Sequence, residues 1–546
     1  MDLNKLADAL IPDADVKPLE YYEEKYPLRG LPEGAQVTRL APSPTGFMHI
    51  GNLYVALANE RIAHQSGGIF YLRIEDTDEK RKVEGAVEVI HKSLKYFGVN
   101  FDEGADLCGE YGPYYQRQRA EIYHAYAKDL IKKGLAYPCF CTEEDLEKTR
   151  EYQTENKLLP GYYGEFAKCR NLTEEEIYEN LKAGKPYVIR LRSQGNVEEK
   201  HTFRDQVKGD ITVTENNQDV VILKSDGIPT YHFAHAVDDH LMGTTHVIRG
   251  EEWLPSLAKH LQLFRYLGFK LPKYMHIAQI MRLDENGNKK KLSKRDMGAN
   301  MDDYTRMGYS PEAVCEYVMT LLNSNYEEWR MQNPDKPYTD FPFNIKKMSI
   351  SGCLFDFNKL GDVSKNVLCR MSASDVTAKV TEWAQGFDPE FGALLAADPA
   401  YAEEIFAIGR GGKKPRKDLA TWADAKPYMG FFYDELYTVE DAIPDTFDKA
   451  DVAAALSAFT KVYDEADDMN AWFDKVKAIA RDLGFADDMK AYKADPAAFK
   501  GSVADVSMFL RVAVTGKQNA PDLYTVMHIL GRERTMARIN ATIASL

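Results

Sequence analysis

The sequence predicts an α/β domain that is interrupted by a smaller inserted α+β domain and followed by a mostly helical C-terminal region. Three observations favour this organisation. β-rich and helical segments alternate from about residue 37, this alternation lapses between residues 136 and 225 before it resumes, and strand signals thin out after about residue 370. At 546 residues the chain is also too long for one hydrophobic core, so we expect several domains.

The first α/β unit is predicted where the short β-rich run QVTRLA stops at a proline. Leu53, Leu57 and Ile62 then follow at nearly helical spacing, and Gly67 with Gly68 ends this segment before the β-rich IFYLRIE. A strand, a helix and a second strand in this order indicate parallel pairing with a right-handed crossover. Ligands of such sheets bind at the carboxyl ends of the strands.

The remaining elements are predicted in chain order. Residues 1–36 are typical of a short helical extension that ends in turn-forming residues. Helices are expected in VEGAVEVIHKSLKYFG and QRQRAEIYHAYAKDLIKKG, and the insertion combines acidic helices such as NLTEEEIYENLKAG with strands such as YVIRLRS. Alanine-rich amphipathic segments, DVAAALSAFTKVYDEA and DLYTVMHILGRERTMARINATI, indicate the helical C-terminal region.

The composition excludes several classes of protein. With 44% hydrophobic and 28% charged residues the chain is typical of a folded globular protein, and a formal charge of −15 argues against binding nucleic acid over the whole surface. Two basic runs stand out, NGNKKKLSKR and GRGGKKPRK. The chain lacks a basic start with an apolar core and any long apolar run, and its seven scattered cysteines suit a reducing compartment, so we expect a cytoplasmic protein without a membrane span.

The segment around His49 is predicted to bind a phosphate group. The first strand gives way to the first helix here, and a helix N-terminus offers unpaired backbone N–H groups and the positive end of the helix dipole. Gly51 lets a nucleotide approach the backbone, and His49 can donate to a phosphate oxygen. Taken alone, such a histidine and glycine are more often a core histidine beside a tight turn.

A resemblance adds to this interpretation. The run RLAPSPTGFMHIGN, followed by RIEDTD, resembles the bacterial glutamyl-tRNA synthetases, which are class I aminoacyl-tRNA synthetases with a Rossmann-like catalytic domain. Their lysine-rich second motif corresponds to KLSKR at residues 291–295. The resemblance implies catalytic roles for His49, Lys291 and Lys294, and ATP and Mg²⁺ as ligands. It implies ATP contacts from His49, Gly51, Asn52, Trp253, Lys291 and Lys294. Asn52 departs from the second histidine of the general class pattern.

The same resemblance implies a glutamate pocket formed by Arg39, Ser43, Glu75, Tyr231 and Arg249. Its chemistry suits the substrate, because a guanidinium group pairs with a carboxylate through two parallel hydrogen bonds. The related glutaminyl-tRNA synthetases typically have PPEPNG and DDTNP where this chain has APSPTG and EDTD, which favours glutamate. His235 stands where the family commonly has asparagine.

The inserted region contains a candidate metal site. Cys139 and Cys141 are separated by one residue, and Cys169 follows about thirty residues later. Some members of the family use a tyrosine or a histidine as the fourth zinc ligand, and Tyr162 matches best here. A structural Zn²⁺ site and a group of buried, reduced cysteines both remain open.

The resemblance implies which domain of the chain contacts each part of the tRNA. We expect, in order, an N-terminal extension (1–36), the first half of the catalytic domain (37–135), an inserted domain for the tRNA acceptor end (136–225), the second catalytic half (226–300), a stem-contact region (301–369) and a helical anticodon-binding region (370–546). In the second basic run, Arg416 is a candidate reader of an anticodon base, and Lys413, Lys414 and Lys417 are candidate phosphate ligands. A solvated loop explains this run as well.

The expected function is ATP-dependent ligation of L-glutamate to the 3′ end of tRNA(Glu) through a glutamyl-adenylate intermediate, by a monomer. A non-discriminating form that also charges tRNA(Gln) stays open. A tRNA-modifying paralogue lacks the anticodon region, so the long C-terminal region argues against it. A non-catalytic tRNA-binding protein has no use for lysines at a pyrophosphate, so Lys291 and Lys294 argue against that alternative.

Overall fold

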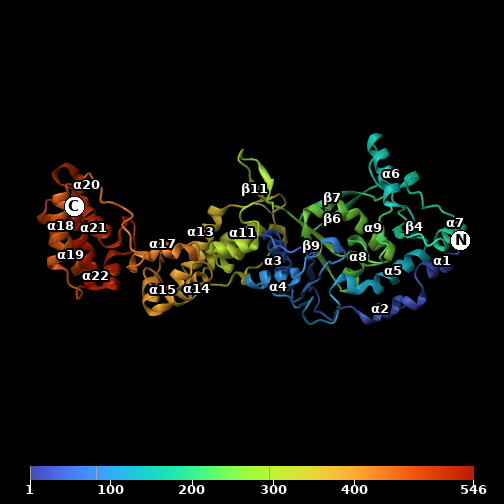
Figure 1. Cartoon of the computed structure of the whole chain (residues 1–546), viewed down its shortest axis with the longest axis horizontal. Coiled ribbons are helices and arrows are strands. Elements are labelled where there is room, and N and C mark those ends of the chain that lie inside the picture. The colour runs from blue at the N-terminus through green and yellow to red at the C-terminus, as the bar shows by residue number, and fades with distance from the viewer. Residues whose placement is uncertain (1, 82, 294–295) are drawn as a thin grey trace. The chain divides into compact units, whose positions relative to one another are not determined.

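The computed structural model describes residues 2–81, 83–293 and 296–546. The chain divides into two compact units, one formed by Met1–Asp303 with Cys315–Asp356 and the other by Tyr304–Val314 with Phe357–Leu546. The first unit contains the strands and the second is helical (Figure 1). The predicted fold class is therefore confirmed, and each unit is described in turn.

A parallel sheet forms the centre of the first unit. β1 (Val37–Leu40), β2 (Ile69–Leu72) and β3 (Glu103–Gly104) are hydrogen-bonded in this order, and both pairings are parallel. β9 (His246–Gly250) and β10 (Lys273–Ile277) form a second parallel pair. Thr245, just before β9, donates its backbone N–H to the carbonyl of Val37 over 3.0 Å, so the two parts of the sheet meet at β1.

The order of strand, helix and strand and the parallel pairing of β1 with β2 agree with the prediction. α3 (Ile50–Gln65) connects the strands and is followed by Gly67, whose φ of +68° places it in the left-handed region. At Gly68 a Cβ atom would lie 1.9 Å from the carbonyl oxygen of Gln36, so only glycine fits where β2 begins. All of β1 and most of β2 are buried, which explains their continuous apolar pattern.

Several helices cover this sheet or continue the α/β alternation. They are α4 (Ala86–Tyr96), α5 (Ala120–Lys132), α8 (Tyr231–Leu241) and α9 (Leu257–Leu267). The N-terminal extension forms α1 (Leu3–Leu10) and α2 (Leu19–Lys25), which pack against α5. Tyr22 Oη donates to Glu121 over 2.7 Å and Tyr26 Oη to the carbonyl of Gly112 over 2.8 Å, so the extension is a folded part of this unit.

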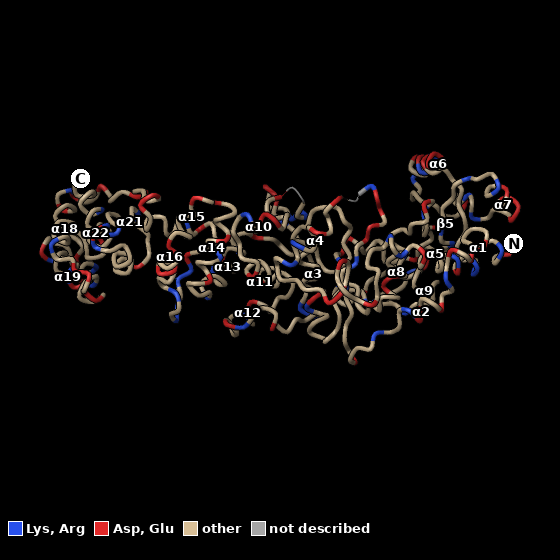
Figure 2. Tube along the Cα trace, turned by 60° about the horizontal axis from the view of Figure 1, so that its bottom comes forward, with Lys and Arg blue, Asp and Glu red and all other residues tan. Residues whose placement is uncertain are grey.

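The inserted region switches from parallel to antiparallel pairing. β4 (Ala136–Cys139), β5 (Val188–Leu191) and β8 (Val221–Leu223) form one antiparallel sheet, and β6 (Lys200–Asp205) with β7 (Gly209–Thr214) forms a hairpin. α6 (Glu143–Glu155) and α7 (Glu174–Lys182) are the predicted acidic helices, and the acidic residues of α6 are marked in red along the trace in Figure 2. The domain boundaries drawn from the sequence stay predictions.

A small sheet follows the second half of the α/β region. β11 (Ile280–Leu283) pairs antiparallel with β12 (Lys289–Lys291) and parallel with β13 (Cys353–Leu354). Three helices lie between β12 and β13 in the sequence: α10 (Met301–Met307), α11 (Pro311–Leu322) and α12 (Tyr326–Gln332). Lys291, from the second predicted motif, therefore ends a β-hairpin.

The second unit is built from helices that surround one apolar core. They are α13 (Phe357–Leu368), α14 (Ala373–Phe387), α15 (Pro389–Ala397), α16 (Pro399–Phe406), α17 (Ala425–Met429), α18 (Lys449–Val462), α19 (Met469–Asp482), α20 (Met489–Ala494), α21 (Val503–Thr515) and α22 (Leu523–Ser545). Within α22, Gly531 has a φ of 78° and a ψ of 164°, so this element consists of two helical segments joined at a kink.

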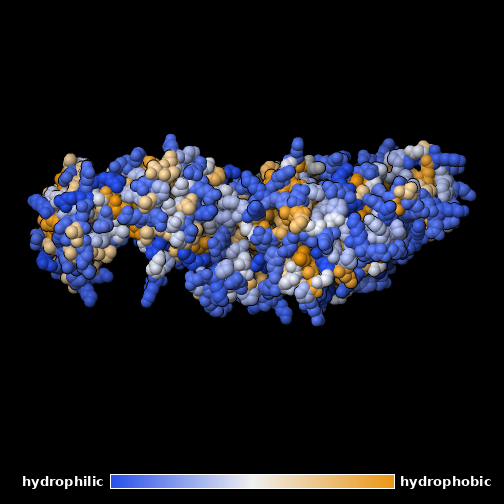
Figure 3. Space-filling view, turned by 90° about the horizontal axis from the view of Figure 1, so that it is seen from below, coloured by the Kyte–Doolittle hydropathy of each residue, from blue (hydrophilic) through white to orange (hydrophobic). Residues whose placement is uncertain are grey.

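The surface is largely hydrophilic. Hydrophobic residues appear as scattered areas in the view of Figure 3, and the mean hydropathy of the chain is −0.44. In the part of the chain that the structure describes, no helix is both long and apolar enough to span a bilayer.

Candidate active site

A cavity of about 1620 Å³ lies at the carboxyl ends of the parallel strands. Its lining includes Leu40 at the end of β1, Gly250 at the end of β9 and Ile277 at the end of β10. The residues predicted to bind ATP and glutamate also line it: Arg39, Ser43, His49, Gly51, Asn52, Glu75, Tyr231, Arg249, Trp253 and Lys291. Lys294 lies outside the described residues. The structure thus brings this set together, and the role of each residue stays a prediction.

The first motif forms the start of α3. Asn52 accepts a hydrogen bond from the backbone N–H of His49 through Oδ1 over 3.0 Å, so the asparagine that departs from the class pattern caps the helix. A Cβ atom on Gly51 would lie 2.8 Å from two atoms of the His49 ring, and glycine therefore leaves room for the imidazole. Gly51 and Asn52 thereby shape the start of α3 where it borders the cavity.

The residues that follow the second motif lie against the first motif. Ile50 donates its backbone N–H to Ala299 over 2.9 Å, and Met301 donates to Met48 over 3.1 Å. Asp296, which follows the motif, accepts through its carboxylate from the backbone N–H and the hydroxyl of Ser293 over 2.7 and 2.8 Å. Lys291 and the start of α3 line the same cavity.

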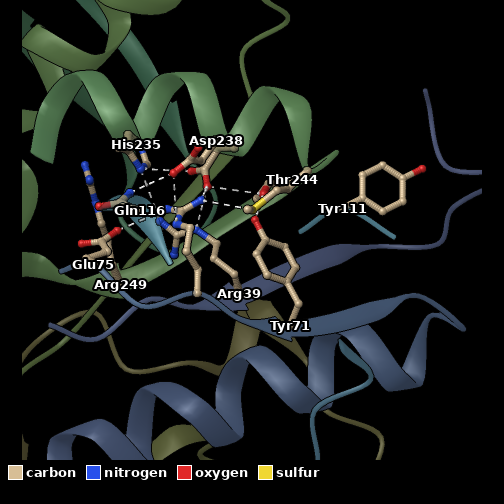
Figure 4. Close-up of polar contacts among 12 residues, drawn as sticks. Arg39, Tyr71, Glu75, Tyr111, Gln116, His235, Asp238, Thr244 and Arg249 are labelled. Atoms are coloured by element: carbon tan, nitrogen blue, oxygen red, sulfur yellow. Dashed lines mark hydrogen bonds and ion pairs between the residues drawn. The ribbon is translucent and has the colours of Figure 1, made fainter. Parts of the chain in front are cut away.

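A network of buried charges lies beside Arg39 and Glu75 in the cavity lining (Figure 4). Arg73 Nη1 donates to Asp239 Oδ1 over 2.7 Å, and Arg119 Nε donates to Asp238 Oδ1 over 2.7 Å. Tyr123 Oη and Gln116 Nε2 complete the hydrogen bonding of Asp238 over 2.7 and 2.9 Å. Buried charges are tolerated when they are paired and hydrogen-bonded. This network therefore holds α8 against α5 and the end of β2.

Arg39 belongs to this network of buried charges. Its Nε donates to Asp239 Oδ1 over 3.2 Å, and both side chains are almost fully buried. Burial by itself would raise the pKa of Asp239, but the charges of Arg39 and Arg73 outweigh burial and lower it. Arg39 therefore reaches the cavity with a carboxylate already beside it.

Glu75 follows β2 and is 9% exposed. Burial raises the pKa of its carboxyl group to about 7, although the neighbouring Arg73 and Arg39 act to lower it. Arg73 Nη2 donates to Glu75 Oε1 over 3.2 Å. The carboxyl group is consequently balanced between its two protonation states near neutral pH.

Arg249 differs from Arg39 in its partners. Its Nε donates to His276 Nε2 and its Nη1 contacts His260 Nδ1, both over 3.0 Å, and the guanidinium carbon lies 4.9 Å from the centre of the Tyr274 ring. Among the described residues Arg249 has no carboxylate partner, and its Nη2 has no hydrogen-bond partner. With only 5% of its surface exposed, Arg249 brings an uncompensated positive charge to the cavity.

The three predicted cysteine ligands converge in the inserted region. The Sγ atoms of Cys139, Cys141 and Cys169 lie within 4.8 Å of one another, and Tyr162 Oη is 3.3 Å from the first two. Hydrogen bonds from the neighbouring thiols lower the pKa of Cys139. Arg190 lies 3.9 Å over the Tyr162 ring. Three thiols and one phenol oxygen form a four-donor set whose chemistry suits Zn²⁺.

The second basic run lies in the other unit. Arg416 makes a bidentate ion pair with Asp418 over 2.7 and 2.9 Å, so its guanidinium is occupied. Lys413, Lys414 and Lys417 are exposed. The base-reading role predicted for Arg416 requires that it exchange Asp418 for a nucleotide, whereas the lysines are accessible to phosphates.

Comparisons with known proteins decide the family. The family described as "tRNA synthetases class I (E and Q), catalytic domain" matches residues 36–357, and an anticodon binding domain matches residues 410–543. Glutamate–tRNA ligase of Acetivibrio thermocellus is 49% identical over 544 residues, which cover 99% of both chains. The chain belongs to the glutamate–tRNA ligase family of class I aminoacyl-tRNA synthetases.

Other comparisons agree with this assignment. Glutamate–tRNA ligase of Clostridium perfringens is 50% identical over 548 residues, covering 99% of this chain and all of the relative. The crystal structure of a glutamate tRNA ligase from Elizabethkingia meningosepticum in complex with its amino acid superimposes with a TM-score of 0.74 at 28% identity, over 94% of this chain and 99% of that one. The predicted family and enzyme class are confirmed.

Sequence reasoning missed part of this synthetase's site. Arg73, Asp238 and Asp239 had not been singled out, and neither had the two histidines that contact Arg249. One signal was present: Arg73 interrupts a predicted buried strand, and the acidic pair interrupts a mostly apolar helix. Ionisable residues are rarely buried unless they are paired, so these positions indicate partners elsewhere in the chain.

Proposed function

We propose that this enzyme ligates L-glutamate to the 3′ end of tRNA(Glu), using ATP and a glutamyl-adenylate intermediate. Family membership supports the ligation of glutamate to tRNA in translation. The observation that carries the proposal is the shared cavity, which is lined at one place by the two nucleotide motifs and at another by Arg39, Glu75 and Arg249. A carboxylate and a triphosphate can therefore meet in one site.

In this proposal ATP binds at the N-terminus of α3. His49, Gly51 and Asn52 contact the phosphates, Trp253 packs beside the nucleotide, and Lys291 with Lys294 neutralises charge that develops on pyrophosphate. Mg²⁺ accompanies ATP and adds divalent charge on the phosphate oxygens. Carboxylates of Asp78, Glu79 and Glu252 line the cavity and offer the oxygen donors that this ion prefers.

The amino acid occupies the other end of the cavity. Arg39 and Arg249 pair with its carboxylates, Glu75 pairs with its ammonium group, and Ser43 and Tyr231 complete the pocket. An oxygen of the α-carboxylate attacks the α-phosphorus of ATP, the new O–P bond forms, and the bond to pyrophosphate breaks. No side chain acts as a nucleophile, so the protein contributes alignment and electrostatic stabilisation.

The second step transfers glutamate to tRNA. A hydroxyl of the terminal adenosine attacks the adenylate carbonyl and AMP leaves; class membership assigns this attack to the 2′-hydroxyl. We assign the acceptor end to residues 136–225, the stem to 301–369 and the anticodon to 370–546, with Lys413, Lys414 and Lys417 as phosphate ligands and Arg416 as a base reader. Cys139, Cys141, Tyr162 and Cys169 hold a structural Zn²⁺, and the enzyme acts as a monomer.

The test is aminoacylation of purified tRNA(Glu) and tRNA(Gln) with radiolabelled glutamate, glutamine and aspartate. We expect ATP-dependent transfer of glutamate to tRNA(Glu) and none of glutamine or aspartate. Transfer of glutamate to tRNA(Gln) as well identifies the non-discriminating form. Failure to charge tRNA(Glu) with glutamate, or charging with glutamine, refutes the proposed function.

A further inference from the structure

Two buried histidines hold Arg249 in place. His276 on β10 and His260 on α9 are both fully buried, and each places a ring nitrogen 3.0 Å from a nitrogen of the Arg249 guanidinium. They come from different elements and contact different nitrogens of the arginine. The guanidinium is thus fixed from two sides, while its third nitrogen, Nη2, has no hydrogen-bond partner among the described residues.

The hydrogen bonds determine which ring nitrogens carry protons. A guanidinium group can only donate, so His276 Nε2 and His260 Nδ1 must both accept. The proton of His276 is then on Nδ1, which lies 2.7 Å from the carboxylate of Asp205. The proton of His260 is on Nε2, which lies 3.0 Å from His232 Nδ1. Each histidine is therefore held in one tautomer by a second partner.

Asp205 is itself well anchored. It lies at the end of β6, is fully buried, and accepts backbone hydrogen bonds from Val207 over 2.9 Å and Lys208 over 2.8 Å at the turn into β7. Its carboxylate also accepts from His276, through the backbone N–H over 3.2 Å and the ring Nδ1 over 2.7 Å. An aspartate, a histidine and an arginine thus follow one another from the hairpin turn to the cavity.

Both histidines are neutral. Burial lowers the pKa of His260 well below its ordinary value, and burial lowers that of His276 even though Asp205 acts to raise it. Burial and the charges of Lys259 and Arg249 lower the pKa of His232 to about 4. Neither histidine therefore offers Arg249 a negative charge, whereas Arg39 is paired with Asp239.

We infer that His260 and His276 are positioning residues that orient Arg249 for a carboxylate of the amino acid without neutralising its charge. The inference rests on the proposed function, because it concerns the same pocket. A carboxylate in place of either histidine would also fix the guanidinium, but it would compete with the substrate for it. Neutral acceptors provide orientation and leave the charge-assisted hydrogen bonds to the ligand.

The decisive experiment compares two variants at one position. In His260→Asn the side-chain oxygen can replace the accepting Nδ1 without charge, and His260→Asp has nearly the same shape but carries a negative charge. Glutamate and ATP KM values and kcat are measured by aminoacylation of tRNA(Glu), with thermal unfolding as a check on folding. We expect the glutamate KM of His260→Asp to exceed that of His260→Asn by about tenfold or more, because charge-assisted hydrogen bonds to the substrate are lost.

The outcomes separate the possible failures. The ATP KM of the two variants should agree within about threefold, since Arg249 does not contact ATP in this proposal. Equal glutamate KM values in the two variants would show that His260 only fills space, and the inference would be wrong. A wild-type enzyme that does not charge glutamate would instead refute the proposed function.

A second variant covers the case in which His260→Asp does not fold. Asp205→Asn keeps an acceptor for the hairpin turn but removes the charge that fixes the tautomer of His276. We expect a higher glutamate KM with an unchanged ATP KM. A wild-type glutamate KM in this variant would show that Asp205 does not orient Arg249 through His276.

Discussion

The pKa of Glu75 predicts how glutamate binding depends on pH. Burial raises this pKa to about 7, and the proposed role of Glu75 requires the carboxylate form, which attracts the ammonium group of the substrate. For a pKa of about 7 the ionised fraction is about 10% at pH 6, about 50% at pH 7 and about 90% at pH 8. The glutamate KM should therefore fall about fivefold from pH 6 to pH 7 and about twofold from pH 7 to pH 8.

The same pKa predicts the stability of a variant. A carboxyl group whose pKa is raised from 4.5 to about 7 on folding favours the folded state when protonated, and this contribution is lost as pH rises from about 4.5 through 7. The difference corresponds to about 3 kcal/mol at pH 8. Glu75→Gln mimics the protonated form, so we expect it to unfold at a higher temperature than the wild type at pH 8 and to bind glutamate poorly.

The measurements are steady-state aminoacylation between pH 6 and 8 at saturating ATP, and thermal unfolding of both proteins at pH 5 and pH 8. The stability difference should be small at pH 5 and clear at pH 8. A glutamate KM that does not change over this range, or a Glu75→Gln variant less stable than the wild type at pH 8, would refute the reasoning.

Three further predictions concern other parts of the chain. Lys291→Ala should lower the rate of adenylate formation by about 100-fold or more with little change in tRNA affinity, whereas Lys289→Ala, in the same strand but outside the cavity lining, should not; equal rates in both variants would remove Lys291 from the site. The purified protein should contain about one zinc ion per chain by elemental analysis, and Cys141→Ser should lose it and unfold at a lower temperature; wild-type protein prepared without chelators that contains no zinc would favour reduced thiols. Replacing Lys413, Lys414 and Lys417 by alanine should weaken tRNA binding. It should also reduce the slope of log affinity against log salt concentration by the equivalent of up to about three phosphate contacts, and an unchanged slope would indicate a solvated loop.

Local patterns in the sequence were sufficient for most of the fold. The predicted strand, helix and strand correspond to β1, α3 and β2 because strand propensity, helical spacing and a glycine pair all act within a few residues. The kink at Gly531 was not predicted, since a single glycine in a long amphipathic segment has no unique local consequence. Nor could the docking of the N-terminal extension be predicted, because it depends on contacts such as that of Arg29 with Glu103, 74 residues away.

The residues of the site could be predicted only where they belong to a sequence motif. The resemblance supplied the residues that line the cavity, but the ion pairs beside them join residues far apart in sequence, such as Arg73 and Asp239 at a separation of 166. Periodicity shows that a charged residue lies in a buried element, yet it cannot show which partner compensates it. Both Arg39 and Arg249 lie near the ends of buried strands, so the sequence pattern does not distinguish them. It could not show that one is paired with a carboxylate and the other is not.

The roles proposed for Glu75 and Arg249 suit one zwitterion and provide a control for the pH prediction. Arg249 lacks a carboxylate partner among the described residues, and Glu75 ionises more readily once a cation lies beside it. Glutamate supplies both an anion and a cation, so binding should lower the pKa of Glu75 and release a proton near pH 7. Glutarate has the two carboxylates without the ammonium group, and it should therefore inhibit more weakly as pH rises from 6 to 8, opposite to the trend for glutamate. Parallel pH trends for the two compounds would show that Glu75 does not meet the ammonium group.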